Sequence, residues 1–131
     1  NAAELVAGLK AFADFEITVS AYPEKHPESP DFMTDIDMLK RKVDNGATRA
    51  ITQFFFDNDT YERYVERVRR AGIYIPIVPG ILPVHNFGQL SKFAGLCGAT
   101  IPTGWQSVLR DWTRIRKPDH WWPLRWLQTR S

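Results

Sequence analysis

The sequence predicts an α/β fold built around a parallel β-sheet. Segments with the spacing of helices alternate with strand-like segments along residues 1–102, in the order α-β-α-β-α-β-α. The third strand-like segment is almost entirely apolar, as is typical of parallel strands that are buried on both faces. Alternation of this kind predicts βα units joined by right-handed crossovers, with helices covering the sheet.

The start of the chain predicts a helix, a strand and an unusual loop. Apolar side chains recur at helical spacing over residues 2–13, and Glu4 suits the first turn of a helix. Residues 15–21, FEITVSA, alternate and include β-branched residues, which predicts a strand. The segment 21–32, AYPEKHPESPDF, has three prolines, too many for a helix or a central strand. We interpret it as a stiff ligand-binding loop at the end of the strand, against the simpler alternative of a surface loop with scattered charges.

A second helix and a second strand follow this loop. Thr34 is predicted to begin the helix, with Asp37 three residues later in an arrangement like a capping box. Gly46 is predicted to end it, because glycine readily adopts the left-handed conformation that follows many helices. Residues 48–55, TRAITQFF, form the second predicted strand.

A third helix, a third strand and a short fourth helix complete the alternation. Asp57 or Asn58 is predicted to cap the third helix, and Gly72 to close it. Residues 74–82, YIPIVPGIL, are the third predicted strand. The fourth helix is predicted over residues 86–97, where Asn86 begins it and Gly98 ends it.

Two architectures are compatible with this order of elements. One is an open, doubly wound sheet, and the other is a (β/α)₈ barrel, of which three strands would form less than half. A dinucleotide-binding fold of the Rossmann type has no support, because no G-x-G-x-x-G motif follows any predicted strand.

The composition indicates a globular domain, or part of a larger one, from a reducing compartment. Of the 131 residues, 44% are hydrophobic and 24% are charged, and no apolar run is long enough to span a membrane. The single cysteine, Cys97, excludes an internal disulfide and favours a cytoplasmic location. The spacing of His and Cys residues gives no sign of a metal site. Because the first residue is not Met and no signal peptide follows it, we expect the chain to begin inside a longer protein.

Polar residues at the carboxyl ends of the strands are the candidates for ligand binding, since both architectures bind ligands there. Gln53 lies inside an apolar run, where its amide either bonds to neighbouring backbone or contacts a ligand. Tyr22 either stacks on a planar ligand or seals the core. Residues 40–42, Lys-Arg-Lys, form either a solvated face or a site for an anion such as a diphosphate. Spacing alone therefore indicates a planar, anionic small molecule near Tyr22, Arg41 and Gln53.

Three longer segments are more specific: VSAYPEKHPES, LKRKVDNGATRAITQFFFDNDTY and IPIVPGILPVHNFGQLSKFAGLCGATIP. Together they closely resemble methylenetetrahydrofolate reductase, almost without gaps over residues 1–102. The RAITQFFF and PGILP segments are highly specific. The resemblance implies a (β/α)₈ barrel that binds FAD at the carboxyl ends of its strands, of which this chain would form a part holding the fifth, sixth and seventh strands.

The resemblance also implies an activity. The family reduces 5,10-methylenetetrahydrofolate to 5-methyltetrahydrofolate with FAD, after NADH or NADPH has reduced the flavin, as part of one-carbon metabolism and methionine biosynthesis. It further implies a cytoplasmic enzyme, a homo-oligomer at full length, without membrane or nucleic-acid partners. The family's catalytic carboxylate and its flavin-modulating Asp would lie upstream of residue 1. No catalytic residue is therefore expected in this chain, which alone would be inactive.

Nine positions match ligand-contacting positions of the family. Six match residues that contact FAD: Tyr22, His26, Ser29, Asp35, Arg41 and Lys42. The proline-stiffened loop would wrap FAD, with Arg41 and Lys42 near its charged portion. Three match residues that contact the folate substrate: Gln53, Gln89 and Phe93, the last as an aromatic that stacks on substrate. Met38 stands where relatives can carry an asparagine that contacts FAD.

The tail, residues 103–131, departs from the family after Pro102. It carries all five Trp residues and six basic against two acidic residues. Arginine and aromatic residues together suit single-stranded nucleic acid, which gives an alternative function to this segment. We expect instead that the tail is a frameshifted reading of the normal gene, since one permitted alternate-frame translation lacks stop codons, is acidic and helix-like, and resembles the family's own continuation.

Overall fold

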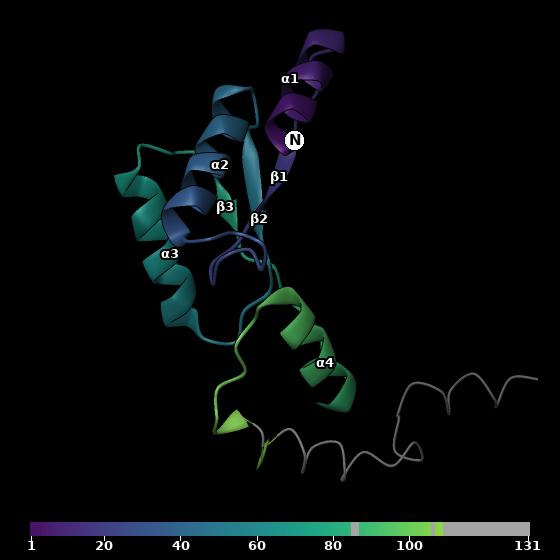
Figure 1. Cartoon of the computed structure of the whole chain (residues 1–131), viewed down its shortest axis with the longest axis vertical. Helices are drawn as coiled ribbons and strands as arrows, with labels where there is room; N and C mark the ends of the chain where they lie inside the picture. Colours follow the sequence, from purple (N-terminus) through teal and green to yellow (C-terminus); the bar gives the residue numbers. More distant parts are fainter. Residues whose placement is uncertain (85–86, 106, 109–131) are drawn as a thin grey trace, which may run out of the picture.

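The computed structural model describes residues 1–84, 87–105 and 107–108. Helices and strands alternate along them in the predicted order, which confirms an α/β fold with a parallel sheet (Figure 1). The elements are α1 (Ala2–Phe12), β1 (Thr18–Ala21), α2 (Phe32–Asp44), β2 (Arg49–Thr52), α3 (Asn58–Arg70), β3 (Ile77–Val78) and α4 (Phe87–Cys97).

The three strands form one parallel sheet in the order β1-β2-β3. Ser20 of β1 lies opposite Ile51 of β2, which in turn lies opposite Val78 of β3. Helices α2 and α3 cover one face of this sheet, and α4 lies beyond the carboxyl ends of the strands (Figure 1). Because side chains alternate between the two faces of a strand, Ser20, Ile51 and Val78 lie on the face that α2 and α3 leave open. Ile51 is 46% exposed and Val78 is 39% exposed.

The hydrophobic core lies between the sheet and helices α2 and α3. Leu39 of α2, Val68 of α3 and Ile73 of the following turn are almost completely buried. They pack with Ala50 of β2 and Ile77 of β3, on the covered face of the sheet. The apolar faces of the two helices are therefore the surfaces that hold them on the sheet.

Aspartate side chains cap the first turns of α2 and α3. Asp57 caps α3 as predicted, through a hydrogen bond that its carboxylate accepts from the backbone N–H of Asp59 at 3.0 Å. The predicted start of α2 at Thr34 is wrong, because Asp31 takes the capping position and accepts from the N–H of Thr34 at 2.7 Å. That bond lowers the pKa of the Asp31 carboxyl below its ordinary value. The predicted start of the fourth helix at residue 86 lies outside the described residues.

The third strand is much shorter than the predicted segment 74–82. It consists of Ile77 and Val78 alone, between Pro76 and Pro79. Proline has no N–H to donate, so it cannot continue the ladder of hydrogen bonds. The expectation that this segment is buried on both faces is also wrong in the described part of the chain, since Ile77 is buried while Val78 is partly exposed.

Gly80 lets the chain cross close to the end of β2. Its N–H donates to the hydroxyl of Thr52 at 2.9 Å. A Cβ added at this glycine would lie 2.1 Å from the backbone carbonyl oxygen of Thr52, well inside contact distance. Glycine at position 80 is thus required by the close approach of two backbones.

Neither a membrane-spanning helix nor a metal-binding cluster occurs in the described ranges. None of the helices there has the length and apolar character needed to cross a membrane. Nor do three or more His, Cys, Asp or Glu side chains gather there in a way that could hold a metal ion.

Candidate functional site

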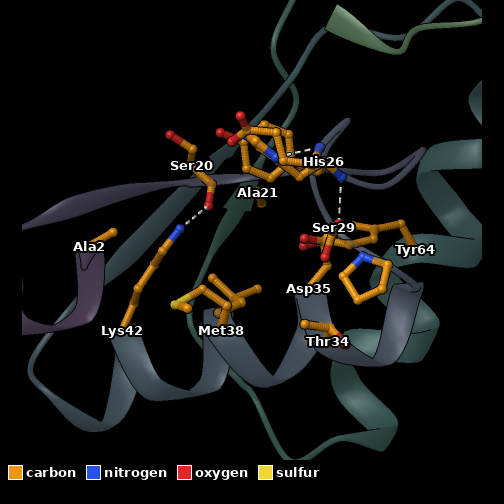
Figure 2. Close-up of a pocket in the computed structure, with 14 residues that line it drawn as sticks. Ala2, Ser20, Ala21, His26, Ser29, Thr34, Asp35, Met38, Lys42 and Tyr64 are labelled. Atoms are coloured by element: carbon orange, nitrogen blue, oxygen red, sulfur yellow. Dashed lines mark hydrogen bonds between the residues drawn. The ribbon is translucent and has the colours of Figure 1, made fainter.

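A pocket of about 410 Å³ lies between the end of β1, the proline-rich loop and helix α2 (Figure 2). Its lining includes five of the six residues predicted to contact FAD: Tyr22, His26, Ser29, Asp35 and Lys42. Met38 of α2 also lines it. Arg41, the sixth predicted residue, is exposed on α2 and lies outside the lining.

Helical spacing explains why α2 contributes Lys42 and not Arg41. Asp35, Met38, Leu39 and Lys42 stand at positions i, i+3, i+4 and i+7, so they share one face of the helix. Arg41 precedes Lys42 by one residue, which rotates it about 100° around the helix axis. The family resemblance implies that Arg41 and Lys42 both lie near FAD. Of the two, only Lys42 lines the pocket.

His26 is held in place by contacts on several sides. Its backbone N–H donates to the carboxylate of Asp35 at 2.5 Å, and its Nδ1 accepts from the backbone N–H of Glu28 at 3.1 Å (Figure 2). Its ring meets the ring of Tyr22 edge to face, with the centroids 4.6 Å apart. Because Nδ1 is an acceptor, the proton of the neutral ring is assigned to Nε2. The Nε2–H of His26 is therefore available as a donor.

Lys25 holds the loop together from within. Its backbone has a positive φ of 77°, which is uncommon for a residue other than glycine. Its ammonium donates to the carbonyl oxygens of His26, at 3.2 Å, and of Ser29. Sequence reasoning did not single out Lys25, because nothing in the composition of the loop signals a left-handed lysine.

Lys42 is a buried cation on the wall of this pocket. Its residue is 8% exposed, and its ammonium donates to the backbone carbonyl of Ser20 at 3.2 Å (Figure 2). Within the described ranges, no carboxylate lies within ion-pair distance of it. Burial lowers the pKa of Lys42 from its ordinary value, and the charge of Asp35 offsets part of this effect. The ammonium retains donors for a further partner.

The three residues predicted to contact folate lie near one another but do not line one pocket. Gln53 borders a shallow hollow of about 280 Å³ on the open face of the sheet, and its side-chain oxygen accepts from the N–H of Phe54 at 3.2 Å. Gln89 and Phe93 of α4 line a separate pocket of about 420 Å³. The rings of Phe54 and Phe93 stack, with the centroids 5.5 Å apart and the planes 16° from parallel. Phe54 thus connects the end of β2 to α4.

Tyr64 and Glu28 are the two titratable residues of the first pocket that were not predicted to contact a ligand. Tyr64 of α3 is buried at 2% exposure while also lining the pocket. Burial raises the pKa of its hydroxyl, so the group stays protonated. Glu28 lines the pocket from the loop. Its place two residues after His26 in the sequence was the signal that could have identified it as a pocket residue.

The tail lies mostly outside the described residues. Of its five Trp residues, Trp105 alone is described, and its ring lies 6.2 Å from that of Phe56. The predicted nucleic-acid alternative, which depends on residues 103–131, falls largely on the part that the structure does not describe.

Comparison with known proteins agrees with the resemblance read from the three segments. The family model described as methylenetetrahydrofolate reductase matches residues 1–120, a range that extends beyond Pro102. The 5,10-methylenetetrahydrofolate reductase of Salmonella typhimurium is 55% identical over 108 residues, which are 82% of this chain and 36% of that protein. The protein of the same name from Escherichia coli is 53% identical over 110 residues, 84% of this chain and 37% of its own length.

A plant relative is more distant. The methylenetetrahydrofolate reductase (NADH) 1 of Arabidopsis thaliana is 41% identical over 97 residues, covering 67% of this chain and 16% of that protein. The chain therefore spans little more than a third of the bacterial relatives it matches, and less of the plant protein. With a family match over most of its length, the chain belongs to the methylenetetrahydrofolate reductase family.

Proposed function

We propose that this chain is part of a methylenetetrahydrofolate reductase, in which it supplies one side of the FAD site and part of the folate site. The reaction is the reduction of 5,10-methylenetetrahydrofolate to 5-methyltetrahydrofolate, with NADH or NADPH as reductant. The observation that carries this proposal is the buried Lys42 on the wall of a pocket, beside four other residues that match the family's cofactor contacts.

A buried ammonium with no ion-pair partner favours an anionic ligand. Placing a cation where water is scarce costs free energy unless an opposite charge or several hydrogen bonds compensate it. In the described part of the chain, Lys42 has a carbonyl partner and only a more distant carboxylate, Asp35. A phosphate group of FAD would complete its hydrogen bonds and neutralise its charge.

The other lining residues suit the remaining parts of such a cofactor. Tyr22 offers an aromatic ring at the end of β1, and His26 offers an Nε2–H donor from a fixed ring. The pocket volume of about 410 Å³ lies within the usual range for small-molecule sites. The residues present therefore fit the group, with Tyr22, His26, Ser29, Asp35 and Lys42 as the ones that would hold it. The chemistry that FAD supplies when bound is hydride transfer between the nicotinamide and the folate.

Gln53, Gln89 and Phe93 would position the folate. The amide of Gln53 can donate to and accept from a pterin-like ring at the carboxyl end of β2. Phe93 is 47% exposed, so one side of its ring remains open for stacking while the other side meets Phe54. The hollows that these residues border would form parts of one substrate site in the complete enzyme.

The open face of the sheet supports the view that the chain is part of a larger barrel. Ile51 is too exposed for an apolar residue in the central strand of a parallel sheet, which is normally covered on both faces, and Val78 beside it on β3 is exposed as well. We propose that the remaining strands of a (β/α)₈ barrel cover this face and contribute the catalytic carboxylate. Under the same proposal the enzyme is cytoplasmic, is a homo-oligomer at full length, and has no role in binding nucleic acid.

The test is FAD binding to the full-length protein that contains residues 1–102 of this chain. Lys42→Ala should weaken FAD binding by about 5- to 150-fold, the equivalent of losing a charge-assisted hydrogen bond of about 1–3 kcal/mol. Lys40→Ala is the matched control, because Lys40 lies on the same helix and pairs with Asp44 at 2.9 Å. Equal FAD affinity in the wild type and both variants would contradict the cofactor site.

A further inference from the structure

The loop after β1 is tied to the turn after α4 by a single carboxylate. Both oxygens of Glu24 lie 3.0 Å from the backbone nitrogen of Thr100, which donates to them across 76 residues of sequence. The bond is exposed to solvent, and its acceptor is an ionised carboxylate, which makes it stronger than a bond between neutral groups in the same setting. Glu24 therefore joins the loop that carries Tyr22 and His26 to the end of the helix that carries Gln89 and Phe93.

A close approach of the two backbones supports this link. Gly98 has a positive φ of 69°, and a Cβ added there would lie 3.4 Å from Cγ of Pro27 and 3.7 Å from the carbonyl oxygen of Lys25. Cys97, Gly98 and Ala99 face the loop across a gap of only about 10 Å³. The turn after α4 and the proline-rich loop therefore lie close together at Gly98.

The end of β2 forms the third side of this junction. Gln53 and Phe54 border the same small gap, and Phe54 is buried to 7% exposure among Ala94 and Ala99. The ring of Phe54 also stacks on Phe93. A shift of α4 relative to the loop would therefore disturb both the Glu24 contact and the surroundings of Gln53.

We propose that Glu24 is a positioning residue that couples the cofactor side of the site to the substrate side. Glu24 lies outside the cofactor pocket, so its action goes through the loop and the turn. A ligand that orders the loop then also orders α4, and by linkage α4 favours the loop conformation that binds the cofactor. The identity of the two ligands rests on the proposed function. The contact between Glu24 and Thr100 does not depend on it.

The experiment is hydrogen exchange on the full-length protein, with and without FAD. In the wild type, FAD should slow exchange at the amides of residues 94–100 by about fivefold or more, the low end of ordinary coupling. Glu24→Ala should abolish this slowing and speed exchange at Thr100 in the cofactor-free protein. Glu24→Gln should restore both, because the amide oxygen still accepts from the Thr100 N–H. Glu62→Ala, on the exposed face of α3, is the control and should behave as the wild type.

Steady-state kinetics provide a second readout. Glu24→Ala should raise the KM for methylenetetrahydrofolate about fivefold while kcat changes less than about twofold, since substrate positioning and not hydride transfer is affected. Slowing of exchange by FAD that is equal in the wild type and Glu24→Ala would overturn the coupling. If the wild type binds no FAD, the proposed function fails. Separately, unchanged exchange at Thr100 in cofactor-free Glu24→Ala would overturn the proposed link between Glu24 and Thr100.

Discussion

Replacing Lys42 with methionine should separate the stability of the fold from the affinity for the cofactor. Methionine keeps an unbranched apolar side chain of similar length, so the packing of the buried stem is largely preserved. The variant loses the hydrogen bond from the ammonium to the Ser20 carbonyl, which contributes about 1 kcal/mol, but it also removes the cost of burying a charge. These contributions oppose each other, so we expect the free energy of unfolding at pH 7 to change by less than about 1 kcal/mol.

The effect on the cofactor should be larger and in one direction. Loss of the cation removes about 1–3 kcal/mol of charge-assisted bonding to an anionic ligand, with nothing to offset it. FAD affinity of Lys42→Met should therefore fall by about 5- to 150-fold while the protein remains folded. Isothermal titration with FAD and urea unfolding of the same samples measure the two quantities, with Lys40→Met as the control.

The difference in unfolding free energy between the wild type and Lys42→Met should change with pH in a direction that follows from the pKa of Lys42. Burial lowers the pKa of Lys42 in the folded protein, whereas in the unfolded chain it stays near the ordinary 10.5. Below the folded-state pKa both states are protonated, and the cost of the buried charge is fully present. As the pH rises from the lowered pKa toward 10.5, the folded state loses its proton first, and the wild type gains stability relative to Lys42→Met. A difference in unfolding free energy between the two cofactor-free proteins that is flat or falls over this range would refute the reasoning.

The remaining predictions concern three other parts of the chain. Gly80→Ala should destabilise the fold by about 2 kcal/mol or more, because its methyl group would lie 2.1 Å from the Thr52 carbonyl oxygen; a midpoint of thermal unfolding equal to that of the wild type would contradict this. Gln53→Ala in the full-length enzyme should slow the folate half-reaction while flavin content stays near that of the wild type, and normal folate kinetics would return Gln53 to a structural role. We propose that residues 103–131 are a frameshifted reading, so DNA resequencing across codons 100–131 should reveal an error; an error-free gene whose alternate frame is unlike the family would end that proposal.

Periodicity and capping residues predicted the elements well where local rules decide them. The order of the elements and the cap at Asp57 follow from spacing and short side chains that compete for backbone N–H groups. The left-handed backbone at Gly46 and Gly72 was expected for the same reason. The length of β3 was not predictable from its apolar residues, because Pro76 and Pro79 interrupt its hydrogen bonds.

The site was predictable to the extent that the carboxyl ends of parallel strands meet at one edge of the sheet. That rule predicted a site near Tyr22 and His26, and the family motifs added Lys42 of α2; all three residues line one pocket. Contacts made across long stretches of sequence could not be foreseen, such as the bond from Thr100 to Glu24, since neither residue carries a local signal for the other.

The most direct test of the central claim is to purify the full-length protein that contains residues 1–102 of this chain and assay it. The claim predicts bound FAD at about one per chain and formation of 5-methyltetrahydrofolate from 5,10-methylenetetrahydrofolate with NADH or NADPH, both diminished in Lys42→Ala. The 131-residue chain alone should show no such activity. A folded full-length protein without bound flavin and without product, or an active, stoichiometrically yellow 131-residue chain, would contradict the claim.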